Sequence, residues 1–174
     1  MTAMGIKQLN GTYIPTEDRI LLRLSTDVGE EFRLWLTRPL TGELIAAIHA
    51  AAVRPIVEKF PSPVAQTVAE FEQQAVKAQT KLDDRFQPGT TLPLGDAPVL
   101  VVKLTATEKA GDLSLDLALP DGRNVSLSLQ LKLAQHIGVL LDKLQQSASW
   151  ALARPGAQAQ DAGAATPGEQ KIVH

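Results

Sequence analysis

The sequence predicts an α+β domain made of two units, each an antiparallel strand hairpin followed by a helix, with an extra helix joining them. Three patterns indicate this fold: two stretches in which apolar and polar residues alternate, three stretches with apolar residues at helical spacing, and a match between the two halves of the chain. With 174 residues, the chain is long enough to bury one core. We expect a single domain over residues 1–153, with the two units at about 6–54 and 99–152.

The first unit should contain a strong β-hairpin. Before it, the turn-forming pair Asn10-Gly11 separates short apolar fragments, so one weak strand at most is expected in residues 1–17. From Asp18 the residues alternate, around a turn at 27–31. Successive side chains of a strand point to opposite faces. The apolar residues that share one face and should form the core are Ile20, Leu22, Leu24, Phe32, Leu34 and Leu36.

A helix should follow this hairpin. Thr41 is a suitable N-terminal cap, and Leu44 and Ile48 then recur at helical spacing. Pro55 has no amide hydrogen and disfavours helical geometry in the residue before it. The helix is therefore expected to end at about Arg54.

The connecting helix is predicted at about 62–85. It should begin near Ser62 and carry an apolar stripe that includes Val64 and Phe71. Residues 87–98, in which Pro, Gly and Thr are concentrated, should form an irregular loop.

The second unit should begin with one long central strand at 99–107. Two alternating strands are then expected at 113–119 and 125–129, followed by a helix at about 133–152. Near the end of that helix, Trp150 is interpreted as a packing anchor.

The two units match when Gly29 is placed on Gly122, an offset of 93 residues. At this offset the hairpins superpose in pattern, and Leu44 falls on Ile137 in the following helix. An internal duplication would explain the match, although alternation of leucine with polar residues also arises by chance.

The two hairpins differ on the face opposite the core. In the second hairpin this face carries the polar and acidic residues Asp112, Ser114, Asp116, Ser126 and Ser128. The first hairpin carries a different set at and beside the matched positions. We call this set the Arg/Trp face, and its candidate binding residues are Arg19, Leu21, Arg23, Arg33, Trp35 and Arg38. Arginine and tryptophan are enriched in binding hot spots, so the Arg/Trp face is the best functional candidate in the sequence.

Several environments are open for the Arg/Trp face. The 62–84 helix or the N-terminal segment could cover it, with Glu70, Glu72 or Gln73 pairing with the arginines. It could also form the seam of a symmetric dimer, bind another protein, or bind a nucleic acid or a phosphorylated ligand. Binding that weakens with salt would favour the last of these.

Residues that usually catalyse reactions or bind metals are not spaced as in a catalytic or metal-binding motif. The chain has no cysteine, and no two of its histidines share a helix face; they are His49, His136 and His174. The acid pairs at 30–31 and 83–84 should point apart and be solvated. No phosphate-binding loop, dinucleotide fingerprint, nucleophile elbow or zinc-protease motif occurs. We expect a non-enzymatic protein without a cofactor or metal.

Composition gives little support to polyanion or membrane binding. The formal net charge is −2 and aromatic residues make up 4% of the chain, so neither a global positive field nor a stacking platform is expected. The most apolar window, 44–57, is too short for a membrane span, and no secretory signal is recognised. We expect a cytoplasmic protein with a disordered tail at 154–174.

The run from Asn10 to Arg38, which contains EFRLWLTR, resembles the start of small bacterial proteins of an uncharacterised family with no known activity. In architecture, repeated strand-then-helix units are similar to the Pur/Whirly type of single-strand nucleic-acid binders. We therefore expect an adaptor or binding protein that uses the Arg/Trp face for a protein partner or for homodimerisation. Single-stranded nucleic-acid binding is the first alternative, and an enzyme without a recognisable motif is the second.

Overall fold

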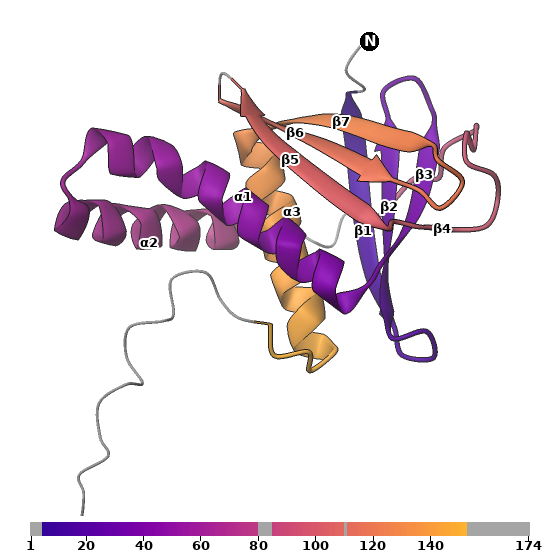
Figure 1. Ribbon diagram of the computed structural model, residues 1–174, viewed down its shortest axis with the longest axis horizontal. Coiled ribbons are helices and arrows are strands. Elements are labelled where there is room, and N and C mark those ends of the chain that lie inside the picture. The colour runs from indigo at the N-terminus through magenta and orange to yellow at the C-terminus, as the bar shows by residue number, and fades with distance from the viewer. Residues whose placement is uncertain (1–4, 80–84, 110, 153–174) are drawn as a thin grey trace, which may run out of the picture.

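A computed structural model describes residues 5–79, 85–109 and 111–152 (Figure 1). Within them, two β-sheets and three helices confirm the α+β class and the two hairpin-plus-helix units. The tail predicted at 154–174, the acid pair at 83–84, His174 and residues 80–84 of the predicted connecting helix lie outside the described residues.

The first sheet contains four strands, in the order β1 (Ile6–Ile14), β2 (Arg19–Thr26), β3 (Glu31–Leu36) and β4 (Val99–Leu100). The first three are antiparallel neighbours, whereas β4 pairs in parallel with β3. The second sheet contains three antiparallel strands, in the order β5 (Lys103–Lys109), β6 (Asp112–Ala118) and β7 (Asn124–Gln130).

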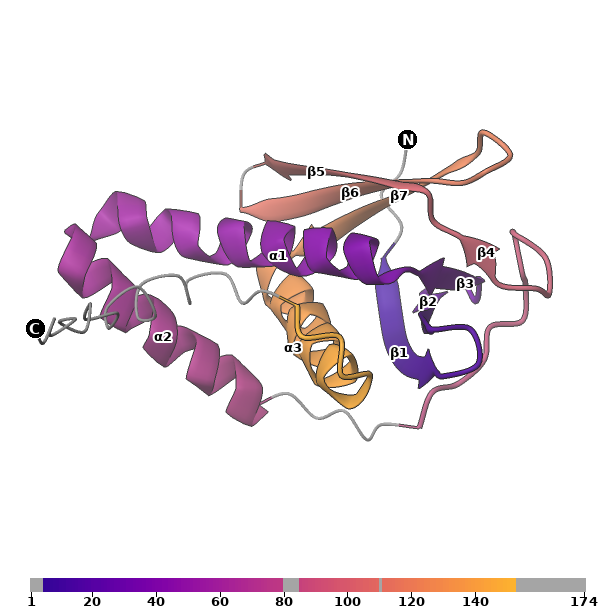
Figure 2. The same cartoon turned by 60° about the horizontal axis from the view of Figure 1, so that its bottom comes forward.

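The helices are α1 (Arg38–Lys59), α2 (Ser62–Gln79) and α3 (Leu131–Ser147). In both views α1 and α2 form a hairpin whose far end projects away from the sheets, and α3 lies beside β1 (Figures 1 and 2). Each of the three helices contacts the other two.

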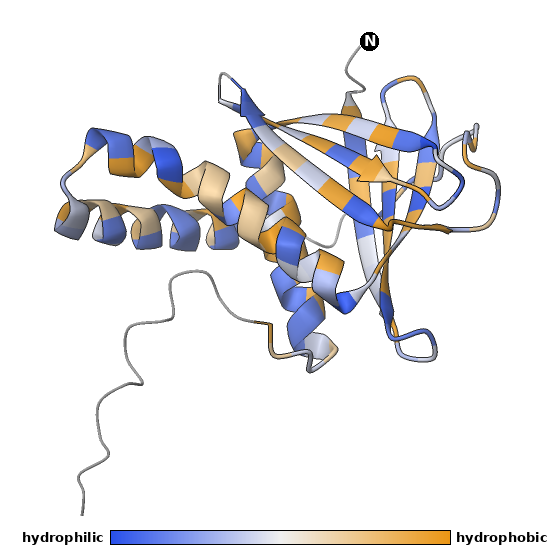
Figure 3. Ribbon diagram, viewed as in Figure 1, coloured by the Kyte–Doolittle hydropathy of each residue, from blue (hydrophilic) through white to orange (hydrophobic). Residues whose placement is uncertain are grey.

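One hydrophobic core joins the inner faces of the two sheets. Apolar and polar residues alternate along the strands (Figure 3), so each sheet buries one face. The buried strand residues are Ile20, Leu22, Leu24, Phe32, Leu34, Leu36, Leu113, Leu115, Leu117, Val125, Leu127 and Leu129. The removal of one leucine side chain from water contributes about 1.5–3 kcal/mol, so these positions supply most of the stabilisation of the strands.

Helices α1 and α3 each pack against a strand of the other unit. Helix α1 follows the first hairpin but contacts β5, and α3 follows the second hairpin and contacts β1 as well as β6 and β7 of its own unit. The two helices meet where Gly138 approaches Ile48: a Cβ atom added to Gly138 would lie 3.1 Å from a methyl group of Ile48. Neither unit therefore has a complete core of its own.

Strand pairing repeats between the units. Leu22 lies opposite Leu34 in the first hairpin, and Leu115 lies opposite Leu127 in the second, as the offset of 93 requires. The match stops at the first strand of each unit, because β5 is displaced by two residues relative to β1. Origin by internal duplication stays a prediction.

The single strand predicted at 99–107 is wrong, because the chain changes sheets within it. The Val101 N–H donates to the Trp35 carbonyl in the first sheet (3.0 Å), and the Val102 N–H donates to the Ala118 carbonyl in the second (2.9 Å). Consecutive amides thus tie the two sheets together. Local β propensity carries no information about which sheet supplies the partner, so the sequence pattern missed this crossing.

The break predicted at Asn10-Gly11 is also wrong, because both residues lie inside β1. Gly11 pairs with Leu22, and a Cβ atom added to it would lie 2.7 Å from the Leu144 Cδ1 atom of α3. Glycine at this position lets the helix approach the strand. A tertiary contact explains this glycine, and no turn is formed there.

The bounds predicted for α1 are wrong at both ends. The helix begins at Arg38, with Thr37 as its cap residue, and the Thr41 hydroxyl donates back to the Thr37 carbonyl at 2.9 Å. The helix also continues through Pro55 to Lys59. Pro55 is solvent-exposed, so its ring displaces no core residue.

Helix α2 does not bury the stripe predicted for it. Among its described residues only Ala65 is buried, while Val64 and Phe71 are 48% and 73% exposed. Its main contacts among the described residues are with the other helices.

Helix α3 ends at Ser147, before the predicted residue 152. The chain then turns so that Trp150 enters the core at 3% exposure. The Trp150 indole N–H donates to Asp18 at 2.8 Å, and its ring lies edge-on to Tyr13. Trp150 is therefore a packing anchor, as predicted, and it joins the end of α3 to the β1–β2 turn.

By length and composition alone, α1 would be able to cross a membrane. It is the only such helix among the described residues. Core helices have the same composition, and α1 contributes Leu40, Leu44 and Ile48 to the core described here.

Candidate binding face on the first sheet

The Arg/Trp face is the outer surface of the first sheet, next to the end of β3. Strand pairing aligns Thr12, Leu21, Trp35 and Leu100 in one row across all four strands. Leu21, Trp35 and Leu100 are each half-buried. Leu100 was missed by the sequence reasoning, because its membership of this sheet depends on the crossing of the chain at β4.

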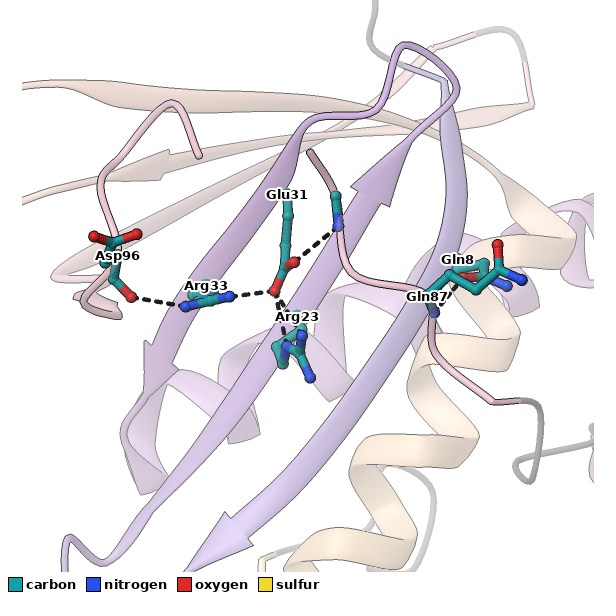
Figure 4. A network of polar contacts seen from close by, with 7 residues as sticks. Gln8, Arg23, Glu31, Arg33, Gln87 and Asp96 are labelled. Carbon is teal, nitrogen blue, oxygen red and sulfur yellow. Dashed lines mark hydrogen bonds and ion pairs between the residues drawn. The ribbon is translucent and has the colours of Figure 1, made fainter. Parts of the chain in front are cut away.

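The next row brings two arginines together. Arg23 lies directly opposite Arg33 on the neighbouring strand, an arrangement in which like charges repel. The Glu31 Oε1 atom accepts hydrogen bonds from the Arg23 Nε atom (2.9 Å) and from the Arg33 Nε atom (2.8 Å), as Figure 4 shows. One carboxylate therefore neutralises part of the charge of two guanidinium groups.

Glu31 is buried, and the expectation that it is solvated is wrong. Its side chain has no exposed surface, and its Oε2 atom accepts a third hydrogen bond from the Gly89 N–H at 2.9 Å. Burial alone would raise the pKa of Glu31, but hydrogen bonds from Arg33, Arg23 and Gly89 outweigh it and lower that pKa. The carboxylate is thus held in its charged form.

The segment 85–98 covers one end of the face. The Gln87 N–H donates to the Gln8 side chain of β1 (2.9 Å), the Phe86 ring lies 4.3 Å from the Arg23 guanidinium, and the Arg33 Nη1 atom donates to the Asp96 carbonyl (2.9 Å). Figure 4 shows the two ends of this path, at Gln87 and at Asp96. Cover by the connecting helix or the N-terminal segment was one of the environments considered from the sequence, and the structure instead places this loop over one end of the face.

Gly89 sets how closely the loop approaches the sheet. A Cβ atom added to Gly89 would lie 2.8 Å from the backbone nitrogen of Glu31 and 2.8 Å from the carbonyl oxygen of Gly29. Backbone atoms on both sides leave no room for a larger residue. The loop is held at the β2–β3 turn as well, where the Thr90 N–H donates to the Gly29 carbonyl at 2.8 Å.

At the other end of the face, Arg19 keeps a positive charge that no described acidic residue pairs with. Arg19 is half-buried, and Arg38 is exposed at the start of α1. The pKa of Asp18 is lowered mainly by hydrogen bonds from Trp150 and Tyr13, with a smaller contribution from the charge of Arg38. The apolar row is therefore bordered by arginines on both sides.

Other titratable residues are not gathered into a site. His49 lies on α1 and His136 on α3; burial lowers the pKa of both, and the charge of Lys132 lowers that of His136 further. Within the described ranges, no group of three His, Asp or Glu residues is arranged to hold a metal ion. On the outer face of the second sheet, the Ser126 hydroxyl donates to Asp116 and both residues are exposed.

Comparison of the chain with models of protein families, with curated protein sequences and with solved structures finds no match. The contacts and charges of the Arg/Trp face are therefore the basis for assigning its role.

Proposed function

We propose that this protein is a non-enzymatic binding protein whose Arg/Trp face recognises an acidic segment of a partner protein. The observation that carries the proposal is the row Leu21–Trp35–Leu100, which is aligned across the sheet and bordered by arginines. At the positions matched to Leu21 and Trp35, the second sheet carries Ser114 and Ser128.

The charges on this face favour an acidic ligand. Glu31 neutralises only part of the charge of Arg23 and Arg33, and Arg19 has no acidic partner among the described residues. Guanidinium groups bind carboxylates with two parallel hydrogen bonds. An acidic side chain of the ligand would pair with Arg19 or Arg38 while an apolar side chain rests on the row.

A protein ligand fits these residues better than a nucleic acid. Stacking of successive bases needs several exposed rings, whereas the row has one ring, Trp35, and Phe86 already lies against Arg23. The formal net charge of −2 gives no long-range attraction for a polyanion.

A peptide selection tests the proposal. A random peptide library displayed on phage is selected on the immobilised full-length chain, and the enriched peptides are measured by fluorescence anisotropy. We expect Asp or Glu beside an aromatic or aliphatic residue in these peptides. Trp35→Ser, which introduces the residue of the matched position, should weaken their binding by about 30-fold or more. Ser114→Ala, on the outer face of the second sheet, is the matched control and should bind normally.

Two results would overturn the proposal. One is that the enriched peptides bind the Trp35→Ser variant as tightly as the unchanged chain. The other is that no acidic peptide is enriched while a single-stranded DNA oligonucleotide binds and loses affinity steeply as salt rises, which would assign the face to nucleic acid.

A further inference from the structure

The free edge of β7 offers backbone groups for pairing. The Leu119 N–H donates to the Arg123 carbonyl at the turn before β7, and hydrogen-bonded pairs alternate along an antiparallel ladder. The residues of β7 whose N–H and C=O groups point away from β6 are therefore Asn124, Ser126, Ser128 and Gln130. Apart from the Gln130 carbonyl, which accepts the first hydrogen bond of α3 as its N-cap, none of these backbone groups has a backbone partner among the described residues.

The other sheet edges carry the features that normally prevent pairing with a second chain. β1 has an irregular register between Ile6 and Gln8, and β4 is only two residues long. The β5 edge is charged, and Glu108 on it is paired with Arg54 of α1 at 3.4 Å. In contrast, β7 has the sequence NVSLSLQ, with no charge, no proline and a regular register.

The sequence of β7 is also self-complementary. Around Leu127, serine stands on both sides, then Val125 and Leu129, then the two amides Asn124 and Gln130. We propose that β7 pairs antiparallel with β7 of a second copy of this chain, about a two-fold axis at Leu127. Such an axis places serine opposite serine, apolar opposite apolar and amide opposite amide.

The residues of β7 whose backbone groups point to the free edge are the ones that this axis pairs. Pairing centred on Leu127 sets Ser126 opposite Ser128 of the second copy, and both have backbone groups that point to the free edge. Each such pair exchanges both N–H···O bonds. Leu127 itself hydrogen-bonds to β6 and meets Leu127 of the second copy as a non-hydrogen-bonded pair. Its side chain stays in the core, where it is 4% exposed.

Charged residues lie only beyond the ends of this strand. Lys132 is exposed in the first turn of α3, and Asp121 in the β6–β7 turn is already paired with Arg123 at 2.7 Å. Since β7 is uncharged, the pairing creates no like-charge contact along its length. The proposal is independent of the Arg/Trp face, which lies on the other sheet.

Light scattering coupled to size-exclusion chromatography of the full-length chain tests the pairing. The unchanged protein should be a dimer that dissociates on dilution. Ser126→Lys combined with Ser128→Lys puts two lysines opposite each other at both symmetric positions and should weaken the dimer by about tenfold or more. Ser126→Lys combined with Ser128→Glu puts opposite charges there and should restore it. Thr105→Lys with Thr107→Lys, two exposed positions on the β5 edge, is the matched control and should dimerise normally.

A monomeric wild-type chain at high concentration would overturn the proposal. So would equal dimerisation of the double-lysine variant and the unchanged protein, or equal weakening by the β5 control. Thermal unfolding followed by circular dichroism confirms that each variant is folded, and the lysine–glutamate variant separates loss of pairing from loss of fold.

Discussion

Glu31 shows how a single buried residue organises the candidate binding face. It neutralises two arginines that lie opposite each other, and it fixes the covering loop through the Gly89 N–H. The alternation of the sequence predicted that Arg23 and Arg33 would share a face. It gave no sign that Glu31 is buried, because the third partner of the carboxylate comes from 58 residues further along the chain.

Glu31→Gln keeps the shape of the side chain but removes its charge, which leaves two guanidinium groups facing each other. We expect a loss of about 3 kcal/mol in the free energy of unfolding near neutral pH, measured by urea denaturation. Glu43→Gln, at an exposed position of α1, is the matched control and should change stability by less than about 0.5 kcal/mol.

The pH dependence identifies the cause of this loss. The pKa of Glu31 is lower in the folded chain than its ordinary value, so its contribution is complete above about pH 4.3 and is lost as the pH falls through the folded pKa. The stability difference between the unchanged protein and Glu31→Gln should therefore shrink in acid. A difference that stays constant down to about pH 3 would contradict the charge-based explanation.

At the scale of an element, helix α1 shows that packing can override the local sequence features that normally mark the ends of a helix. Its interior spacing was predicted from the sequence, and Leu44 and Ile48 are buried as expected. Both predicted ends were wrong. Thr41 is an interior residue with a side-chain bond to Thr37, and the helix passes through Pro55 because Ile56 beyond it is buried at 7% exposure.

Pro55→Ala should stabilise the protein. Alanine restores an amide donor inside the helix, near its C-terminal end, and removes the steric conflict of the proline ring, at an exposed position where no packing is lost. We expect a gain of about 2 kcal/mol after allowance for the more flexible unfolded chain, seen as a higher melting temperature.

Pro39→Ala is the control for the helix, because Pro39 lies in the first turn, where amide groups have no partner within the helix. That change should leave the melting temperature nearly unaltered or lower it. An equal rise in melting temperature from both substitutions would show that strain at Pro55 does not cause the stabilisation.

At the scale of the whole molecule, the two units share one core. Periodicity predicted which face of each strand is buried, and the α+β class followed from it. It could not show that α1 covers β5 and α3 covers β1, because a pattern identifies the apolar face of an element but not the element that covers it. The crossing at Val101–Val102 was hidden for the same reason.

Separated halves test this shared core. Fragments 1–79 and 85–174 should each be unfolded alone, because each lacks a strand of the other unit against which its helix packs, β5 for α1 and β1 for α3. An equimolar mixture should regain helical and sheet structure. Circular dichroism and the dispersion of amide NMR signals measure both results. Cooperative thermal unfolding of either fragment alone would show that a unit has a sufficient core of its own.

The contact between α1 and β5 has a consequence for the newly made chain. Helix α1 ends at Lys59, but β5 ends at Lys109, and ribosomes add roughly 5–20 residues per second. Several seconds therefore pass between the synthesis of α1 and that of β5, and during this time the side of α1 that faces β5 is exposed to water. During that interval the nascent chain presents an apolar helix surface of the kind that chaperones bind.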